Sequence, residues 1–413
     1  MFSKSEKSDW KVNEAFELKK ARFHLFTKRI PHTTWAWYTL CMSTGGVALL
    51  LKQTPHQFNG LETIGTVIFI LNLIFFIGIS SALIMRFSLD PDALPFSLRH
   101  NTEGLFFPTF WLALAVIISG IEAYGVPHCG YWLVVTLRVL FWIYVACTFL
   151  VAVFQYYMLF NGSSLTLQNM TPAWLLPVFP VMLTGTIACY VAPIQPAYHA
   201  IPIVVGGATM QGLGMMVSIF MYAQYLGRLM TGGLPSPDAR PGMFIAVGPP
   251  AFTGLAYIGL ANAALEIFPN HRIAGVDLLP VAQVLKIIGL FVAICLWSTS
   301  FWFFCISLTA VIQTFSKMRF HLSWWSFVFP NTGFIIVTIM IGDALESEPI
   351  LWVTSGATLV EVMAWVTVGF CHVKAVWNRE IMWPGQDEDV VSNPEQDPAA
   401  FGLSVQRTIS AIV

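Results

Sequence analysis

The chain has 413 residues, of which 56% are apolar and 10% are charged, with a formal net charge of −1 and a mean hydropathy of +0.69. This composition excludes an ordinary soluble domain, which could not bury so large an apolar fraction. It predicts an integral membrane protein in contact with lipid, and we expect no nucleic acid among its partners.

Ten apolar stretches are each long enough to cross a bilayer. They predict an all-α membrane domain over residues 33–380, preceded by a basic segment at 1–32 and followed by a polar tail at 381–413. The predicted spans, in chain order, are 33–52, 61–86, 105–124, 131–160, 173–193, 200–229, 242–264, 280–313, 325–345 and 350–377.

Every second predicted span carries residues that interrupt α-helices. These are Thr44-Gly45-Gly46, Pro108, Pro177 and Pro180, Gly248-Pro249-Pro250, and Pro330. Proline removes a backbone donor and clashes with the preceding turn, so at membrane depth the freed carbonyls need protein or a water-filled cavity beside them. The alternation therefore predicts an inner ring of broken helices around a pathway and an outer ring of unbroken helices facing lipid.

The distribution of lysine and arginine predicts the orientation. The first 32 residues carry eight of these cations, and the even-numbered connections carry more than the odd-numbered ones, which hold only Lys52 and Arg272. Because positive charge accumulates on the cytosolic side, we expect both termini in the cytosol. The N-terminal segment fits either an amphipathic helix on the membrane surface or a solvated charged tail.

No cofactor site is indicated. The seven cysteines show no paired spacing, and no cluster of histidines and acidic residues has metal-ligand spacing. The histidines fall in predicted tails, connections or span ends, which argues against haem bound deep in a bundle. Since no phosphate-binding loop is present either, we expect no metal, no cofactor and no enzymatic activity.

Four ionisable residues fall inside predicted spans, namely Glu122, Arg138, Lys286 and Glu361. A charge at that depth normally requires a partner or a wet pathway. One interpretation is structural pairing of Arg138 or Lys286 with Glu361, and the other is that Arg138 reaches the pathway and attracts an anion. Arg86, at the cytosolic end of the second span, is either an anchor that reaches the interface or a mouth residue that concentrates anions.

The inner spans hold almost no ionisable side chains, which argues against a cation pathway lined by acidic residues. Broken helices expose amides whose partial positive charge suits carboxylates and small inorganic anions. The hydroxyl and amide side chains on these spans are candidate substrate contacts, and they are Thr44, Thr184, Thr186, Thr253, Asn331 and Thr332.

Several motifs lie at corresponding places along the chain. They are Thr34-Trp-Ala-Trp37, Met42-Ser-Thr-Gly-Gly-Val47, Thr171-Pro-Ala-Trp-Leu-Leu-Pro-Val-Phe-Pro180, Arg240-Pro-Gly-Met-Phe-Ile-Ala-Val-Gly-Pro-Pro-Ala-Phe-Thr-Gly-Leu-Ala256, Phe329-Pro-Asn-Thr-Gly-Phe334 and Pro384-Gly-Gln-Asp-Glu-Asp389. Together they resemble the fungal malic acid transport proteins of the tellurite-resistance/dicarboxylate transporter family, over about residues 30–390.

The resemblance implies five helical hairpins with quasi-fivefold symmetry, in which odd-numbered helices line a central pore and even-numbered helices pack outside. The family includes plant slow-type anion channels and bacterial homologues, where a phenylalanine on the ninth helix blocks the pore. Phe329, directly before Pro330, matches that position and is the predicted gate. The pore-lining candidates then also include Gly45, Gly46, Pro177, Phe244, Pro249 and Pro250.

The resemblance further implies transport of malate and related C4-dicarboxylates, such as succinate and fumarate, across the plasma membrane by a homotrimer with one pore in each protomer. Because the inner spans lack proton-relay carboxylates, we expect channel-like export driven by the membrane potential. A sulfite efflux protein and an inorganic anion channel of the same fold are the alternatives.

Overall fold

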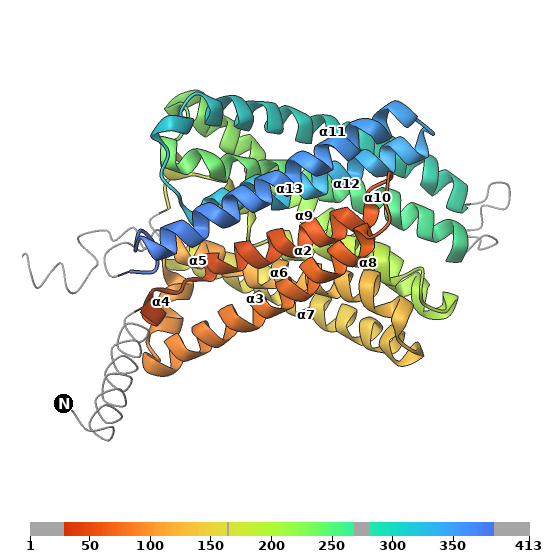
Figure 1. Ribbon diagram of the computed structural model, residues 1–413, viewed down its shortest axis with the longest axis horizontal. Coiled ribbons are helices and arrows are strands. Elements are labelled where there is room, and N and C mark those ends of the chain that lie inside the picture. The colour runs from red at the N-terminus through yellow and green to blue at the C-terminus, as the bar shows by residue number, and fades with distance from the viewer. Residues whose placement is uncertain (1–28, 163–164, 268–280, 384–413) are drawn as a thin grey trace, which may run out of the picture.

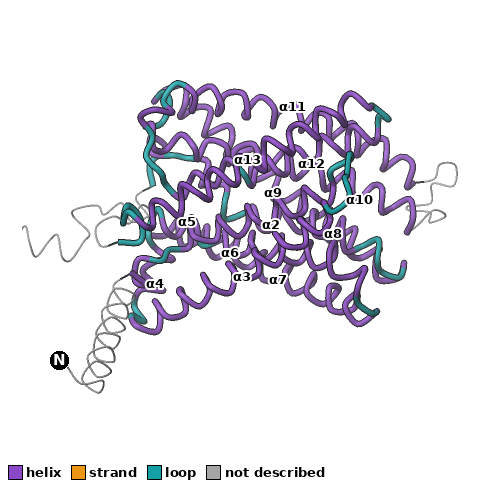
Figure 2. The backbone as a smooth tube through the Cα atoms, viewed as in Figure 1, coloured by secondary structure: helices purple, strands orange, loops and turns teal. Residues whose placement is uncertain are grey.

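A computed structural model describes residues 29–162, 165–267 and 281–383. The regular elements within these ranges are all helices, and they run side by side in one bundle whose loops lie mainly at its two ends (Figures 1 and 2). The predicted all-α class is therefore confirmed. Most of the basic segment 1–32 and of the tail 381–413, including the Pro384 motif, lies outside the described residues.

Eight helical stretches in the described part of the chain are long and apolar enough to cross a membrane. They are Leu61–Leu89, Glu103–His128, Tyr131–Asn161, Ala197–Gly232, Pro237–Ile267, Val281–Ile312, Leu322–Ala344 and Glu348–Trp377. The other two predicted spans correspond to shorter helices, α2 (Tyr38–Gln53) and α8 (Phe179–Val191). Both are shortened at the start, because the chain before each helix forms 3-10 turns at Trp35–Trp37 and Pro172–Leu175.

An inner layer of helices closes into a ring. The ring consists of α2, α6 (Pro108–Gly120), α8, α10 (Gly248–Ile267) and α12 (Phe329–Ala344). Each of these helices contacts the next in that order, and α12 returns to contact α2. The ring brings together helices from opposite ends of the chain, which lie near the middle of the bundle in Figure 1.

An outer layer covers the ring, and each of its helices packs against two neighbouring ring helices. It consists of α3 (Leu61–Leu89), α7 (Tyr131–Gly162), α9 (Ala197–Gly232), α11 (Val281–Ile312) and α13 (Glu348–Trp377). In the most apolar part of the stretch that contains α10, 94% of residues are buried, compared with 17% in α11. The alternation of shielded and exposed spans expected from the sequence is thus present.

The prolines of the inner helices mark where α-helix begins. Pro108 is the first residue of α6, Pro180 and Pro330 are the second residues of α8 and α12, and Pro249 and Pro250 follow the first residue of α10. Proline is well tolerated there, since its missing N–H would have no partner in the first turn. The predicted proline breaks are therefore junctions at which an irregular or 3-10 segment becomes an α-helix.

The predicted break at Gly45 and Gly46 is wrong, because α2 runs without interruption through both residues. These glycines permit close packing instead. A Cβ atom on Gly45 would lie 2.6 Å from Asn72 Nδ2 and 2.7 Å from Val116 Cγ2. Both distances are too short for real contacts, so glycine at this position lets α3 and α6 approach α2 closely.

Candidate functional site

A small cavity lies inside the inner ring, and all the ring helices contribute to its wall. Its volume is about 20 Å³, which is room for one water molecule and too little for an organic acid. The wall includes Gly46 from α2, Val116 and Ser119 from α6, Thr186 and Tyr190 from α8, Phe252 from α10, and Phe329 and Thr332 from α12.

Aromatic rings from the starts of three inner helices meet beside this cavity. Phe329, the first residue of α12, is fully buried and stacks on Phe252 of α10, with ring centroids 4.9 Å apart and 24° between the ring planes. Phe179, the first residue of α8, lies 6.1 Å from the Phe329 ring and 5.8 Å from the Phe252 ring. The three rings occupy space that a continuous pathway through the inner ring would need.

Glycines make room for the rings. A Cβ atom on Gly333 would lie 2.6 Å from the Phe252 ring, so any side chain there would displace that ring. A Cβ atom on Gly46 would lie 3.4 Å from the Phe329 ring and from the Thr332 side chain. Gly46 therefore brings the backbone of α2 directly against the predicted gate.

Of the remaining candidates, Gly46, Thr186 and Thr332 lie in the cavity wall. The Thr332 hydroxyl donates a hydrogen bond to the Val328 carbonyl at 2.9 Å, within its own helix. Asn331 lies beside it, and its Nδ2 donates to the Phe327 carbonyl at 2.8 Å. Both residues thus stabilise the start of α12 next to the ring of Phe329.

A second group of candidates lies on the ring helices themselves but outside the cavity wall. The Thr253 hydroxyl donates to the Pro249 carbonyl at 2.7 Å and accepts from Gln211 Nε2 at 2.8 Å. Pro250 occupies the first turn of α10 with Pro249. Thr184 is fully buried in α8, and its hydroxyl has no hydrogen-bond partner among the described residues.

The remaining candidates point to other parts of the molecule. Thr44 accepts a hydrogen bond from Trp365 Nε1 of α13 at 3.1 Å, so its hydroxyl is directed at the outer layer. Phe244 belongs to a separate aromatic cluster, with its ring 5.8 Å from Phe304 and 5.4 Å from Phe327. Gly45 faces Asn72 and Val116 as described above, and Pro177 lies in the turn before α8.

Among the wall residues that sequence reasoning did not select are Ser119, Tyr190 and Phe252. Ser119 and Tyr190 carry hydroxyls on inner spans, and the criterion that selected the threonines could have included them. Phe252 gives no comparable signal, since the chain contains 33 phenylalanines and only the packing distinguishes this one.

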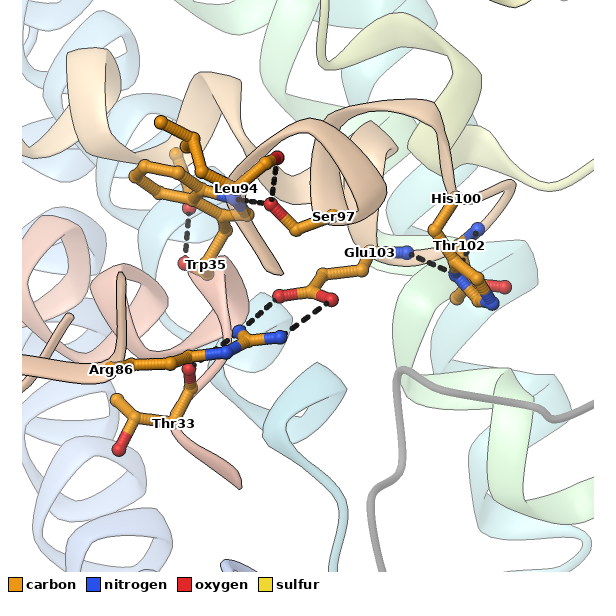
Figure 3. A network of polar contacts seen from close by, with 9 residues as sticks. Thr33, Trp35, Arg86, Leu94, Ser97, His100, Thr102 and Glu103 are labelled. Atoms are coloured by element: carbon orange, nitrogen blue, oxygen red, sulfur yellow. Dashed lines mark hydrogen bonds and ion pairs between the residues drawn. The ribbon is translucent and has the colours of Figure 1, made fainter. Parts of the chain in front are cut away.

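Arg86 lies in a buried ion pair (Figure 3). Its Nη1 and Nη2 atoms donate to the two carboxylate oxygens of Glu103 at 2.5 and 3.2 Å, and Nη1 also donates to the Thr33 carbonyl at 2.8 Å. The nearby Trp35 Nε1 donates to the Ser97 hydroxyl at 3.1 Å. Arg86 thereby joins the chain before α2 to the start of α5 (Glu103–Phe106). Because Glu103 compensates its charge, this pairing does not favour an anion-attracting role.

The charges inside the predicted spans do not form the proposed structural pairs. Glu361 is buried in α13 and makes no ion pair with any described residue. Lys286 is exposed on α11, and Arg138 on α7 has a buried Nη1 atom without a hydrogen-bond partner in the described ranges. None of these side chains lies in the cavity wall. The pairing of Arg138 or Lys286 with Glu361 is therefore not observed.

Comparison with known proteins decides the family. The family model described as "SLAC1: Voltage-dependent anion channel" matches residues 32–373. The chain belongs to this family. The malic acid transport protein of Schizosaccharomyces pombe is 34% identical to it over 390 residues, which cover 94% of this chain and 86% of that protein. The sulfite efflux pump SSU1 of Trichophyton rubrum is 29% identical over 337 residues, covering 80% of this chain and 88% of that protein.

Membership of the voltage-dependent anion channel family fixes the broad class of the protein. The family and the relatives are transporters or channels, so the prediction that the chain is not an enzyme is confirmed. Together with the membrane-length helices, the family makes this chain a multi-pass membrane protein. The predicted resemblance is thereby confirmed as well.

In this family member, His100 lies in the turn between α4 (Ala93–Arg99) and α5 (Glu103–Phe106), before the membrane-length stretch that begins at Glu103. Its Nδ1 atom accepts hydrogen bonds from the backbone N–H groups of Thr102 and Glu103 at 3.3 and 3.2 Å (Figure 3). Burial lowers the pKa of His100 from its usual 6.5, although the Glu103 carboxylate opposes the shift. The neutral ring therefore caps the start of α5.

We predict that this cap makes the folded protein less stable in acid. The folded-state pKa of His100 lies below the unfolded value of about 6.5, so the contribution of the neutral ring is complete above about pH 6.5 and is lost as the pH falls through the folded-state pKa. Thermal unfolding between about pH 7.5 and 5.5 measures the effect. His100→Asn keeps an acceptor that does not titrate and should show a smaller fall in Tm, whereas equal falls would contradict the prediction.

Proposed function

We propose that this protein transports malate and related C4-dicarboxylates through a pathway along the axis of the inner ring. The observation that carries the proposal is the cavity to which every ring helix contributes, with Phe329 packed into its wall, in a chain 34% identical to a malic acid transport protein. Phe329 is the proposed gate, since its ring fills space between the helix starts. Movement of this one side chain would enlarge the cavity without unfolding any helix.

We further propose that the chain crosses the membrane ten times, as five helix pairs with quasi-fivefold symmetry and with both termini in the cytosol. The 3-10 turns before α2 and α8 lengthen these short helices toward the length of a span. The guanidinium of Arg29 lies 5.4 Å from the ring of Trp383, so the two ends of the described chain meet. Ends that meet lie on the same side of the membrane, which is what an even number of crossings requires, and the basic N-terminal segment favours the cytosolic side.

An anionic substrate fits the chemistry of the cavity wall. The wall holds no acidic side chain among the described residues and offers the hydroxyls of Ser119, Thr186, Tyr190 and Thr332. Three of the ring helices, α8, α10 and α12, also begin near the three aromatic rings, and helix N-termini carry partial positive charge. A dicarboxylate would exchange part of its hydration for hydroxyl and helix-terminal donors, whereas a metal cation would find no carboxylate ligand there.

Sulfite efflux is the second candidate, because a sulfite efflux pump is 29% identical over 80% of this chain. The cavity wall suits any small oxyanion, so its chemistry alone does not separate sulfite from malate. Purified protein in liposomes, supplied in turn with malate, succinate, sulfite, nitrate and chloride, separates the candidates. We expect the largest flux with malate, and preference for sulfite would replace the dicarboxylate assignment.

We also propose the plasma membrane as the location and a trimer as the assembly, both on the strength of the family resemblance. The outer helices expose many large apolar side chains, among them Ile77, Phe220, Phe291 and Phe370. Such surfaces suit acyl chains and the flat contacts between membrane helices of neighbouring copies. Each protomer would keep its own pathway, because the cavity is enclosed by helices of one chain.

We predict that Phe329→Ala raises malate flux severalfold in liposomes at equal protein content. The substitution removes a ring that contacts Phe179 and Phe252, and it leaves a water-accessible space where three rings now exclude water. The matched control is Phe291→Ala, which removes a ring that is 72% exposed on α11 and should leave flux unchanged. Unchanged flux in the Phe329 variant would count against the gate.

We predict that export responds to membrane potential without a coupled proton. Malate is mostly a dianion at cytosolic pH, and each elementary charge gains about 2.3 kcal/mol per 100 mV across the membrane. Because the cavity wall has no carboxylate in the described residues to relay a proton, an imposed inside-negative potential should accelerate efflux. A flux that follows an imposed pH gradient and ignores the potential would indicate proton symport instead.

A further inference from the structure

The Thr186 hydroxyl, like that of Thr184, has no hydrogen-bond partner among the described residues, but only Thr186 of the two lies in the cavity wall. Most helical threonine hydroxyls donate to the carbonyl four residues earlier, and examples are Thr148, Thr253, Thr332 and Thr358. Thr186 lies in the cavity wall and is only 7% exposed, yet its hydroxyl makes no hydrogen bond with any described residue. A donor has therefore been left unused at the edge of the cavity.

Asn72 is a second unused polar group close to the same cavity. It comes from the outer helix α3 and is fully buried, and neither its amide nitrogen nor its amide oxygen has a partner among the described residues. Its Nδ2 atom lies 2.6 Å from the point where a Cβ of Gly45 would stand, and Val116 Cγ2 lies 2.7 Å from that point. Because Val116 and Gly46 are wall residues, the Asn72 amide sits directly behind the wall.

Unpartnered polar groups are costly in a protein interior and more costly inside a membrane, where water does not reach them. Replacing both side chains with apolar ones of similar shape would remove that cost. Glycine at position 45 leaves room for the Asn72 amide, since a side chain there would overlap with its nitrogen. The packing thus admits a polar group that no described residue satisfies, as expected if a ligand satisfies it during transport.

We propose that Thr186, in the wall of the central cavity, and Asn72, directly behind that wall, form a binding station for a carboxylate group. The inference rests on the proposed function and adds the residues that bind the substrate as it passes Phe329. A carboxylate oxygen accepts hydrogen bonds from a hydroxyl and from an amide N–H₂, and such bonds to a charged acceptor are stronger than neutral ones. Chloride lacks the two separated acceptor atoms of a carboxylate and gains less from this pair of donors.

The test compares malate and chloride flux in liposomes for the wild-type protein and for Thr186→Val, Thr186→Ser and Asn72→Leu. The valine and leucine variants keep side-chain volume and remove the donors, and the serine variant keeps the hydroxyl. Thr358→Val is the matched control, because Thr358 is buried in α13 but bonded to the Thr354 carbonyl at 2.9 Å and is absent from the cavity wall. Thermal unfolding of each variant is measured in parallel.

We expect Thr186→Val and Asn72→Leu each to raise the KM for malate about tenfold. This is the change expected when one hydrogen bond to a charged group is lost. Chloride flux should change less than about twofold, and Tm should stay the same or rise, since an unsatisfied polar group is removed. Thr186→Ser should retain the wild-type KM. A structural role would instead lower Tm and reduce both fluxes together, which would overturn the station.

Two failures are distinguishable. If the wild-type protein carries malate and both variants keep its KM, the station is wrong and the proposed function stands. If the wild-type protein carries chloride or sulfite but no dicarboxylate, the proposed function is wrong, and the carboxylate assignment of the station falls with it.

Discussion

The closed contact of α2, α6, α8, α10 and α12 is the constraint on which the other features of the molecule depend. A ring of helices leaves an axial space only if the helices cannot collapse onto one another, and in this protein large aromatic side chains occupy that space where three helices begin. The stacking of Phe329 on Phe252, with Phe179 beside them, sets the spacing of α8, α10 and α12. Glycines at positions 46 and 333 then let neighbouring backbone approach the rings.

In the proposed function, the apolar character of this contact keeps the pathway closed. A space of about 20 Å³ holds a single water molecule, and stacked rings offer that water few partners. A hydrated dianion would have to lose most of its water to enter, so the barrier to passage is mainly one of dehydration. A gate of this kind needs only a side-chain rotation or a small helix adjustment, because no ion pair crosses the axial space in the described residues.

Much of this arrangement could be predicted from the sequence, since its causes are local. Proline positions and hydropathy identify the inner spans. The Phe-Pro-Asn-Thr motif, through the family resemblance, selects Phe329, which lies in the cavity wall. The rotation of each helix about its axis could not be predicted, because inner helices are apolar on all sides. Thr44 therefore became a pore candidate although its hydroxyl meets Trp365 of α13, and Ser119 and Tyr190 were not selected although they line the cavity.

Contacts between side chains that are distant in the sequence could not be predicted either. Nothing near Arg86 identifies Glu103 as the carboxylate that neutralises it, because the pairing depends on how α3 and α5 pack. The predicted helix break at Gly45 and Gly46 of α2 is wrong for a related reason. Two adjacent glycines in a span suggest a break by local propensity, whereas their role is set by Asn72 and Phe329, which approach them from other helices.

Separation of the enclosed cavity from water by the Phe329 ring is the proposal on which the assigned function depends. It is tested most directly by the reactivity of a cysteine introduced at Ser119, in protein whose seven native cysteines are replaced, toward a membrane-impermeant anionic thiol reagent. We expect slow modification when Phe329 is present, fast modification when Phe329→Ala is added, and slowing of the fast reaction by malate. Equal modification rates with and without the Phe329 ring would contradict it.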